Sequence, residues 1–248
     1  MSLGLAFETE ERNAPRLGLV VLQADETIEG DFRRMMPSDV DLYVSRVPSS
    51  VDVTPASLAE MENHIGQSAS LFPTPAPFDV IGYGCTSGTS VIGVERVGEL
   101  VRSGASVKAV TEPVSALLAA SGHLGVTRLA FLSPYIESVS SALRSVLTDH
   151  GIETPVFGSF ETGEEAVVAR ISPASLIEAA VEIGTNVEAE ALFISCTNLR
   201  TLDIISTIEE RVGKPVLSSN QVLIWHMCQL AGVKTGKAGF GELLSGLQ

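Results

Sequence analysis

The sequence predicts a parallel α/β fold on the strength of three observations. Strand-like and helix-like segments alternate along almost the whole chain and are joined by short connections. The first strand candidate, residues 16–23, is nearly continuous in apolar residues, as parallel strands are when both of their faces are buried. A turn built around a cysteine occurs twice, at Cys85 and at Cys196, after an apolar run and before a helix-like stretch. This recurrence indicates two similar halves whose strand ends face each other across a cleft.

The first half of the chain supplies four predicted strands and the helices between them. Asp25 can cap the helix that follows the first strand, and a proline begins the next helix. Pro73, Pro75 and Pro77 form a stiff linker into the third strand, which delivers Cys85. Residues 1–15 are polar and expected to be mobile. The predicted strands are residues 16–23, 40–46, 78–83 and 107–110. The first predicted helix has Ile28, Phe32 and Met35 or Met36 at helical spacing, and the other predicted helices are residues 55–71, 90–102 and 113–124.

The second half repeats the alternation of strands and helices. Its first strand leads into Tyr135, and Gly151 marks the end of the helix that follows. Another short apolar strand delivers Cys196. The predicted strands are residues 127–132, 154–158, 191–194 and 215–217, and the predicted helices are residues 136–150, 164–170, 173–184, 202–212 and 220–231.

Composition excludes several classes of protein. The 248 residues suffice for one large or two small domains, and a hydrophobic content of 45% supplies a core. No apolar run approaches the roughly 18 residues of a membrane span, and residues 1–16 lack the apolar centre of a secretory signal. A net charge of −14 argues against nucleic acid as a partner. Three scattered cysteines without a CxxC pair predict neither a disulfide framework nor a metal site, so we expect a cytoplasmic protein with reduced thiols.

The two cysteine turns carry the predicted chemistry. A thiol between a strand and a helix lies near free backbone N–H groups and the positive end of the helix. We expect this placement to lower the pKa of the thiol. Two cysteines on opposite walls of a cleft can react at opposite faces of one substrate carbon. One acts as a thiolate, which attacks the carbon or removes its proton, and the other acts as a thiol, which delivers a proton.

The remaining candidate residues gather around the same strand ends. Ligands of open parallel sheets bind beyond the carboxyl ends of the strands, where Gln23 and Tyr135 are expected together with the two cysteines. Hydroxyl, amide and N–H groups can hold a carboxylate and an adjacent oxyanion without a metal or another cofactor. The residues that supply such groups are Thr86, Ser87, Thr89, Thr197 and Asn198.

Each candidate also has a purely structural interpretation. A lone buried cysteine is commonly a packing residue, and Cys228 lies in an apolar helix where that role is the prediction. Asp25 suits a helix cap, and Tyr135 a structural hydrogen bond. Glu164 and Glu165 are interpreted as solvated charges at a helix start. Neither GxxxxGK[ST] nor a GxGxxG after the first strand occurs, so nucleotide binding is not predicted.

Three segments together resemble the aspartate/glutamate racemase superfamily, and more closely its maleate cis–trans isomerase and arylmalonate decarboxylase branch. They are residues 81–90, 133–135 and 192–201, and the resemblance spans roughly residues 16–240. It implies two Rossmann-like lobes related by a pseudo-twofold axis, catalysis without a cofactor, and a dimer or tetramer. The lobes implied are residues 16–112 plus 217–248, which carry Cys85, and residues 113–216, which carry Cys196.

The resemblance also implies individual roles. Cys85 matches the nucleophile that adds to the alkene carbon, and Cys196 matches the residue that protonates the adjacent carbon. Tyr135 matches a tyrosine that hydrogen-bonds a substrate carboxylate. Arylmalonate decarboxylases keep only the second cysteine, so the presence of both places this chain nearer the isomerases and racemases. The positions matching groups that hold the carboxylates are Thr86, Ser87 and Thr197.

Two departures from this pattern bear on the substrate. Asp25 stands where maleate isomerases carry an asparagine, and acidic residues at 161, 164 and 165 occupy the region of their second asparagine. Two unit charges about 4 Å apart cost about 4 kcal/mol at an effective dielectric near 20, so a dicarboxylate would be repelled and an ammonium group attracted. We therefore expect a carboxylate that also carries a positive or amide nitrogen, such as an amino acid or its acylated derivative. Residues 22–29 also resemble ectoine-utilisation proteins.

Three functional hypotheses follow from the sequence. The leading one is a cofactor-independent isomerase or racemase that uses Cys85 and Cys196 on a small carboxylate. The second is a decarboxylase or lyase, which needs two carboxylates on one substrate carbon and is disfavoured by Asp25. The third is a non-catalytic protein that binds a small molecule in the same fold.

Overall fold

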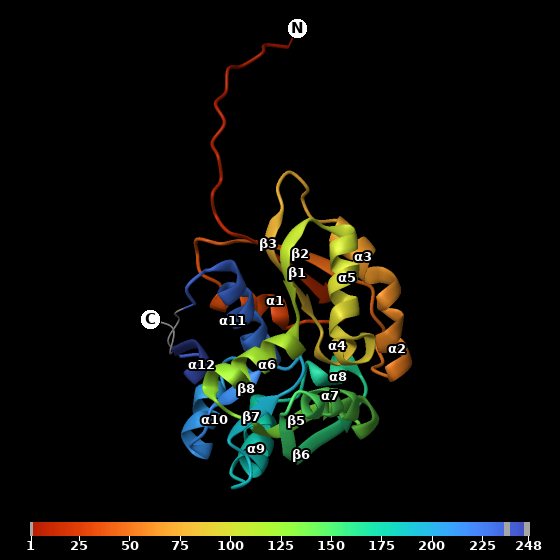
Figure 1. Cartoon of the computed structure of the whole chain (residues 1–248), viewed down its shortest axis with the longest axis vertical. Helices are drawn as coiled ribbons and strands as arrows, with labels where there is room; N and C mark the ends of the chain where they lie inside the picture. The colour runs from red at the N-terminus through yellow and green to blue at the C-terminus, as the bar shows by residue number, and fades with distance from the viewer. Residues whose placement is uncertain (1, 236–238, 246–248) are drawn as a thin grey trace.

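The computed structural model describes residues 2–235 and 239–245 and confirms the predicted α/β class. Within these residues, two four-stranded sheets form, and every pairing of neighbouring strands is parallel. The first sheet lies in the upper half of the molecule and the second in the lower half (Figure 1). The strands are β1 (Arg16–Leu22), β2 (Asp41–Val47), β3 (Phe78–Gly84), β4 (Val107–Thr111), β5 (Arg128–Tyr135), β6 (Glu153–Thr162), β7 (Ala191–Ile194) and β8 (Val216–Ser218).

The two sheets share one strand order. The first runs β2-β1-β3-β4 and the second runs β6-β5-β7-β8. Cys85 follows β3 and Cys196 follows β7, which are the third strands of their sheets in chain order. The two cysteine turns therefore occupy equivalent places, which confirms the predicted internal repeat.

Helices fill the connections between the strands. Several begin as local chemistry dictates: Glu112 accepts two backbone N–H groups at the start of one helix, and Ser172 and Pro173 begin another. The helices are α1 (Ile28–Met35), α2 (Pro55–Glu60), α3 (Glu62–Ser70), α4 (Thr86–Ile92), α5 (Val94–Gly104), α6 (Pro113–Leu124), α7 (Glu137–Asp149), α8 (Glu165–Val168), α9 (Pro173–Gly184), α10 (Ile205–Val212), α11 (Ser219–Ala231) and α12 (Glu242–Ser245).

Two predicted helices differ from the observed ones. The helix expected over residues 55–71 is interrupted at Met61, whose amide donates to the carbonyl of Ala59 instead of continuing the i to i−4 ladder. The helix expected over residues 90–102 begins earlier, at Thr86, and breaks at Gly93. The φ of Gly93 is +97°, a conformation that glycine adopts without a side-chain clash.

The core is continuous between the two sheets. Along β1, Val20 packs into one hydrophobic cluster, while Leu17 and Leu19 pack into another. Leu132 of β5 belongs to the first cluster and Phe131 to the second. Because these strands are buried on both faces, their sequences are nearly continuous in apolar residues, as predicted.

The predicted division into lobes stays a prediction. α11 follows the last strand of the second sheet, yet it packs against β3 of the first sheet and against α6. Strand β8 spans residues 216–218, so the predicted boundary at 217 falls inside it. Residues 236–238 and 246–248 of the first predicted lobe lie outside the described residues.

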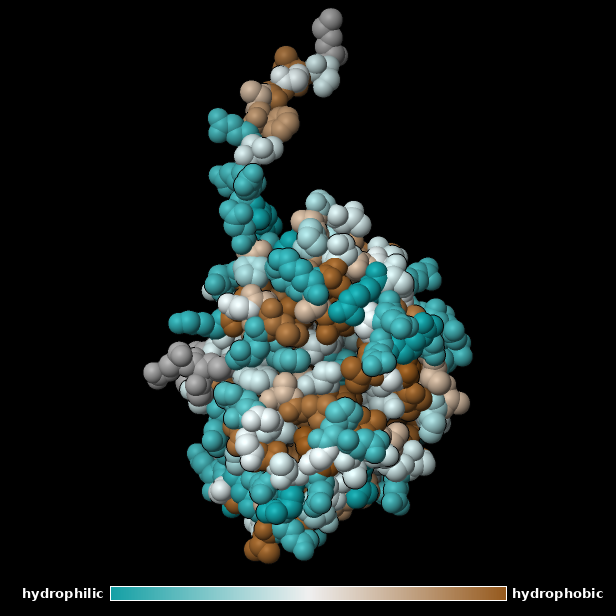
Figure 2. All heavy atoms as spheres, in the orientation of Figure 1, coloured by the Kyte–Doolittle hydropathy of each residue, from teal (hydrophilic) through white to brown (hydrophobic). Residues whose placement is uncertain are grey.

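The N-terminal segment extends away from the body of the molecule (Figure 1, Figure 2). Its hydrophobic side chains Leu3, Leu5 and Phe7 are at least 84% exposed. In the described part of the chain, every helix is too short or too polar to cross a membrane.

Candidate active site

Cys85 lies directly after β3 and is the N-cap residue of α4. Its Sγ accepts a hydrogen bond from the Gly88 N–H at 3.2 Å. A Cβ at residue 88 would lie 2.8 Å from Sγ of Cys85 and 2.7 Å from Cε of Met61, so a side chain there would displace the sulfur. The turn therefore holds the sulfur at the start of a helix, as predicted.

Cys196 occupies the equivalent turn after β7, but it does not lie at the amino end of its own helix. That prediction is wrong, because α10 begins only at Ile205. The φ of Cys196 is +126°, which residues with side chains rarely adopt. Its amide donates to Oγ of Ser219 at 3.0 Å, and its Sγ accepts from the N–H of Asn198 at 3.3 Å. These contacts hold the unusual backbone conformation and fix the sulfur.

Both cysteines line one cavity between the two halves. Each cysteine is only 5% exposed. The space open to the centres of water molecules is about 10 Å³, which is about what one water requires. A larger molecule therefore enters only when lining residues move. The lining residues are Leu22, Asp25, Leu58, Cys85, Thr86, Ser87, Tyr135, Glu165, Cys196 and Thr197.

Backbone hydrogen bonds join two loops of different halves beside the cavity. The N–H of Val53 donates to the carbonyl of Gly163 at 2.7 Å. The N–H of Glu165 donates to the carbonyl of Val51 at 3.0 Å. The first loop leads into α2, which carries Leu58, and the second leads into α8, which begins with Glu165. The loops therefore hold two lining residues in the closed arrangement.

Glu165 is a central residue of the site. Its interpretation as a solvated charge is wrong, because the side chain is buried with 6% exposure, whereas the neighbouring Glu164 is exposed. Oε1 accepts a hydrogen bond from Oη of Tyr135 at 2.8 Å, and Oε2 accepts one from Nδ2 of Asn198 at 2.8 Å. Oη of Tyr135 also lies 3.0 Å from Sγ of Cys196. A glutamate at a helix start usually faces solvent, but α8 begins where the two halves meet.

Asp25 combines the capping role with a place in the cavity. Its Oδ1 accepts the N–H groups of Thr27 and Ile28, both at 2.8 Å, and so caps the start of α1. Its Oδ2 is buried without a hydrogen bond of good geometry among the described residues, and burial raises the pKa of this carboxyl although nearby Thr197 lowers it slightly. A cavity-lining carboxylate thus keeps one unsatisfied oxygen.

The other predicted binding residues divide into three groups. Thr86, Ser87 and Thr197 line the cavity and are buried. Asn198 is not a lining residue, but it hydrogen-bonds two residues that are. Gln23 is exposed and is not brought to the cavity, since it lies just past the end of β1 on the surface.

Ser219 is a residue of the site that the sequence analysis missed. Its Oγ accepts the amide of Cys196 at 3.0 Å and the hydroxyl of Thr86 at 2.8 Å. The next residue, Asn220, donates to the carbonyl of Thr197 at 2.8 Å. One helix start therefore ties the two cysteine turns together. The available signal was the cluster of small polar residues at 218–220, directly after a predicted strand end.

We expect Ser219→Ala to lower the free energy of unfolding by about 2 kcal/mol, because the buried amide of Cys196 and hydroxyl of Thr86 both lose an acceptor. Urea denaturation followed by circular dichroism measures this loss. Ser121→Ala is the matched control, since Ser121 is also buried but its Oγ has no partner among the described residues. Equal losses in the two variants would contradict the bridging role.

The electrostatics of the closed cavity disfavour negative charge. Burial, together with the nearby charges of Glu165 and Asp25, raises the pKa of Cys85 to about 12, even though the N–H of Gly88 lowers it. Burial, followed by the charge of Glu165, raises the pKa of Cys196 well above its ordinary value. Burial also raises the pKa of both carboxyls. The predicted lowering of a thiol pKa is therefore wrong for this state, because the N–H contacts do not offset burial beside two acids.

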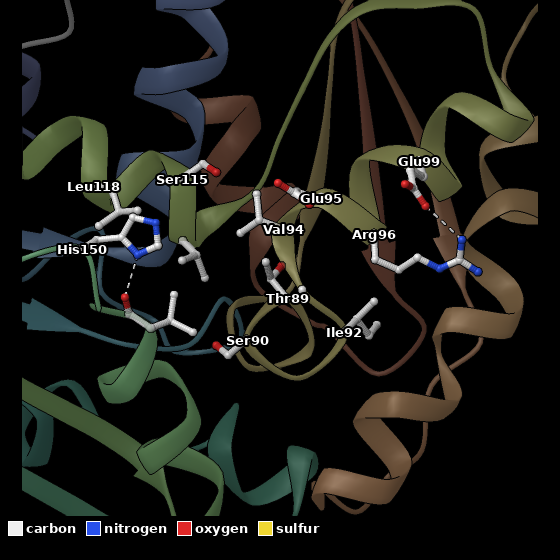
Figure 3. A pocket seen from close by; sticks show the side chains of 13 residues that line it. Thr89, Ser90, Ile92, Val94, Glu95, Arg96, Glu99, Ser115, Leu118 and His150 are labelled. Carbon is white, nitrogen blue, oxygen red and sulfur yellow. Dashed lines mark hydrogen bonds and ion pairs between the residues drawn. The ribbon is translucent and has the colours of Figure 1, made fainter. Parts of the chain in front are cut away.

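A second, larger pocket of about 600 Å³ lies beside α4 and is bordered by α5, the start of α6 and the end of α7 (Figure 3). Thr89 and Ser90 of α4, Leu118 of α6 and His150 line it, and neither cysteine does. Its rim carries Arg96, paired with Glu99 at 3.1 Å. Among the described residues, no group of three or more His, Cys, Asp or Glu side chains could hold a metal ion.

Fold and site together define a class: parallel α/β proteins with two equivalent halves, each contributing a cysteine to a shared cavity. A model of the arylmalonate decarboxylase family matches residues 93–244, which is more than half of the chain. The chain therefore belongs to the arylmalonate decarboxylase family, and the resemblance to this branch is confirmed.

Similar proteins include several maleate isomerases. The chain is 24% identical over 246 residues to a maleate isomerase of Geobacillus stearothermophilus, covering 93% of this chain and 97% of the relative. The structure of a maleate isomerase variant from Pseudomonas putida S16 with maleate aligns with a TM-score of 0.85 at 23% identity, covering 94% and 98% of the two chains. A Nocardia farcinica maleate cis–trans isomerase variant with a covalently bound succinylcysteine intermediate aligns with a TM-score of 0.81 at 22% identity, covering 94% and 98%. At these identities the structural likeness shows a shared fold.

Proposed function

We propose that this chain is a cofactor-independent isomerase or racemase that acts on a small carboxylate. The observation that carries the proposal is that Cys85 and Cys196, one from each half, line one buried cavity. Two such thiols can serve opposite faces of one carbon, one as base or nucleophile and the other as acid. The similarity to a maleate isomerase over nearly the whole chain supports the isomerase class.

The two thiols act in complementary steps. In an isomerisation, the thiolate of Cys85 adds to one alkene carbon and Cys196 protonates the adjacent carbon. The new single bond rotates, Cys196 takes the proton back, and the C–S bond breaks to release the trans isomer. The covalent succinylcysteine of the Nocardia farcinica enzyme is an adduct of this kind. In a racemisation, one thiolate removes the proton next to the carboxylate and the opposite thiol supplies one.

The test is turnover in D2O followed by NMR, with maleate, free amino acids and N-acylated amino acids as substrates. Isomerisation converts a cis to a trans alkene, whereas racemisation replaces the α-hydrogen by deuterium with loss of optical purity. If no carboxylate in this set reacts or exchanges, the enzyme proposal fails and a binding protein remains.

We further propose that the substrate carries a positively charged or N–H-bearing nitrogen beside its carboxylate. Asp25 and Glu165 both line the cavity, and the lining residues include no lysine or arginine. A second carboxylate about 4 Å from either acid would cost about 4 kcal/mol at an effective dielectric near 20. The unsatisfied Oδ2 of Asp25 offers an acceptor to such a nitrogen.

A positive nitrogen would also ionise the thiols. An ammonium group about 4 Å from a thiolate stabilises it by about 4 kcal/mol, which lowers the thiol pKa by about 3. The raised pKa of Cys85 in the closed cavity would then fall toward its ordinary value only when substrate is bound. The substrate nitrogen that hydrogen-bonds Oδ2 of Asp25 would therefore also activate the nucleophilic thiol by lowering its pKa.

We expect Asp25→Asn to lower kcat/KM for a nitrogen-bearing substrate about 100-fold, because an amide lacks the charge that attracts an ammonium group. The fold should persist, since the asparagine oxygen can still cap α1. Steady-state kinetics with an amino acid and with maleate measure the change in preference. Asp52→Asn is the control, since Asp52 is exposed and outside the cavity. An unchanged preference would refute the nitrogen subsite.

The family match favours one second candidate, a decarboxylase. This reaction needs two carboxylates on one carbon, and the charges of Asp25 and Glu165 oppose such a substrate. Release of CO2 from a substituted malonate, lost in Cys196→Ser, would replace the isomerase proposal by this one.

A further inference from the structure

Cys196, Tyr135 and Glu165 form a continuous chain of hydrogen-bonding atoms on one side of the cavity. Sγ of Cys196 lies 3.0 Å from Oη of Tyr135, which lies 2.8 Å from Oε1 of Glu165. All three side chains are buried. They come from the turn after β7, the end of β5 and the start of α8, so only the folded protein assembles the chain.

The tyrosine permits two arrangements of the protons. In the first, the thiol of Cys196 donates to Oη, and the hydroxyl of Tyr135 donates to the carboxylate of Glu165. In the second, both protons have moved by one hydrogen bond, so that Cys196 is a thiolate and Glu165 is a neutral acid. The total charge stays the same in both. Loss of a proton to solvent would instead add a second negative charge to a buried site, which is costly.

Asn198 holds both ends of this chain. Its backbone N–H donates to Sγ of Cys196 at 3.3 Å, and its Nδ2 donates to Oε2 of Glu165 at 2.8 Å. Its Oδ1 accepts the N–H of Glu26 at 2.9 Å, which fixes the orientation of the amide. Burial raises the pKa of both Cys196 and Glu165, which favours keeping the shared proton within the chain.

Cys85 has no corresponding arrangement among the described residues. Its Sγ accepts the N–H of Gly88 and is hydrogen-bonded by the hydroxyl of Tyr83, which lowers the pKa of Cys85. This hydroxyl also lies 3.6 Å from Sδ of Met61, but no hydrogen bond joins it to a carboxylate among the described residues. The two thiols are therefore chemically unequal although their turns are equivalent. Cys196 is the thiol with an internal proton acceptor.

We propose that Glu165, acting through Tyr135, sets the protonation state of Cys196 by taking up its proton and returning it. In the transfer, the S–H bond of Cys196 breaks, its proton bonds to Oη, and the former hydroxyl proton of Tyr135 bonds to Oε1 of Glu165. The return reverses these steps, and nothing is oxidised or reduced. The proposal rests on the proposed function for its use in turnover, where Cys196 alternates between base and acid.

The first experiment does not depend on turnover. Cys85→Ser with Cys228→Ser leaves Cys196 as the sole thiol of the three. The rate of its alkylation by iodoacetamide is measured between about pH 6 and 8. The reagent concentrations are kept in the range where the rate is proportional to concentration. With an internal acceptor the rate should be nearly independent of pH. After Glu165→Gln it should rise about tenfold per pH unit, because the proton then leaves to solvent.

Two further variants make this result specific. Tyr135→Phe keeps Glu165 but removes the connecting hydroxyl, so its alkylation rate should also rise about tenfold per pH unit. Glu164→Gln removes an exposed neighbouring charge and should leave the flat profile unchanged. The proposal is overturned if the alkylation rate of the chain with Cys85→Ser and Cys228→Ser alone rises tenfold per pH unit. It is also overturned if the rate stays independent of pH after Glu165→Gln in a folded variant.

Turnover supplies the second experiment. In the otherwise unmodified chain, Glu165→Gln should lower kcat at saturating substrate about 100-fold, and Glu164→Gln should leave kcat unchanged. If the unmodified chain turns over a carboxylate and Glu165→Gln is equally active, the proton transfer is refuted while the proposed function stands. If the unmodified chain turns over nothing, the proposed function fails, and the labelling profile alone decides the proton transfer.

Discussion

Cys85→Ser and Cys196→Ser are each expected to lower kcat at least about 1,000-fold without unfolding the protein. Serine nearly matches cysteine in size, but its hydroxyl is a far weaker acid and, without a base, a far weaker nucleophile. Because the two thiols act in one reaction, the double variant should be little worse than either single variant. Turnover of the best substrate from the D2O screen measures all three.

Cys228→Ser is the control for this pair. Cys228 is fully buried in α11 but does not line the cavity. Its replacement should lower the free energy of unfolding while leaving kcat unchanged, since the new hydroxyl is placed in an apolar environment. Full activity in both Cys85→Ser and Cys196→Ser would rule out the two-thiol mechanism.

The sequence was enough to predict those residues of the site that lie at the ends of strands. Parallel strands place their carboxyl ends along one edge, so residues directly after apolar runs can be assigned to a common region. That argument brought Cys85, Cys196 and Tyr135 together. It failed for Gln23, because one residue past a strand end the side chain can face solvent instead of the cavity.

Glu165 and Ser219 could not be placed in the same way. Their roles depend on contacts with residues far away in the chain, Tyr135 for one and Cys196 and Thr86 for the other. The local sequence indicates only that each residue lies at the start of a helix. Glutamate and serine are common at helix starts because they cap the helix or favour its dipole, so their presence there does not indicate a functional role. The predicted lobe boundaries and the predicted dimer or tetramer remain predictions.

The thiol pKa values show a further limit of sequence reasoning. A strand-to-helix turn at Cys85 does supply an N–H group to the sulfur. Whether this lowers the pKa depends on burial and on nearby charges, which local sequence does not reveal. Here burial and two acids raise the pKa of Cys85, so activation of this thiol is expected to come from the bound substrate.

Gly104→Ala is expected to lower the free energy of unfolding by about 3 kcal/mol and the melting temperature by about 10 °C. Gly104 ends α5, which packs closely against α3. A Cβ at this position would lie 2.0 Å from the carbonyl oxygen of Gly66 and 2.8 Å from the amide of Ser70. These are backbone atoms of a helix, so no side-chain rotation relieves the overlap, and α3 and α5 have to separate.

Gly122→Ala is the matched control for this substitution. Gly122 is an exposed residue of α6, and a Cβ there meets no atom within 4 Å. The change should therefore raise the free energy of unfolding by about 0.5–1 kcal/mol, because alanine loses less backbone entropy than glycine on entering a helix. Calorimetry of the two variants separates the effects, since helix propensity acts at both positions while the overlap acts only at residue 104. If Gly104→Ala were as stable as Gly122→Ala, α3 and α5 could not be as close as the structure has them.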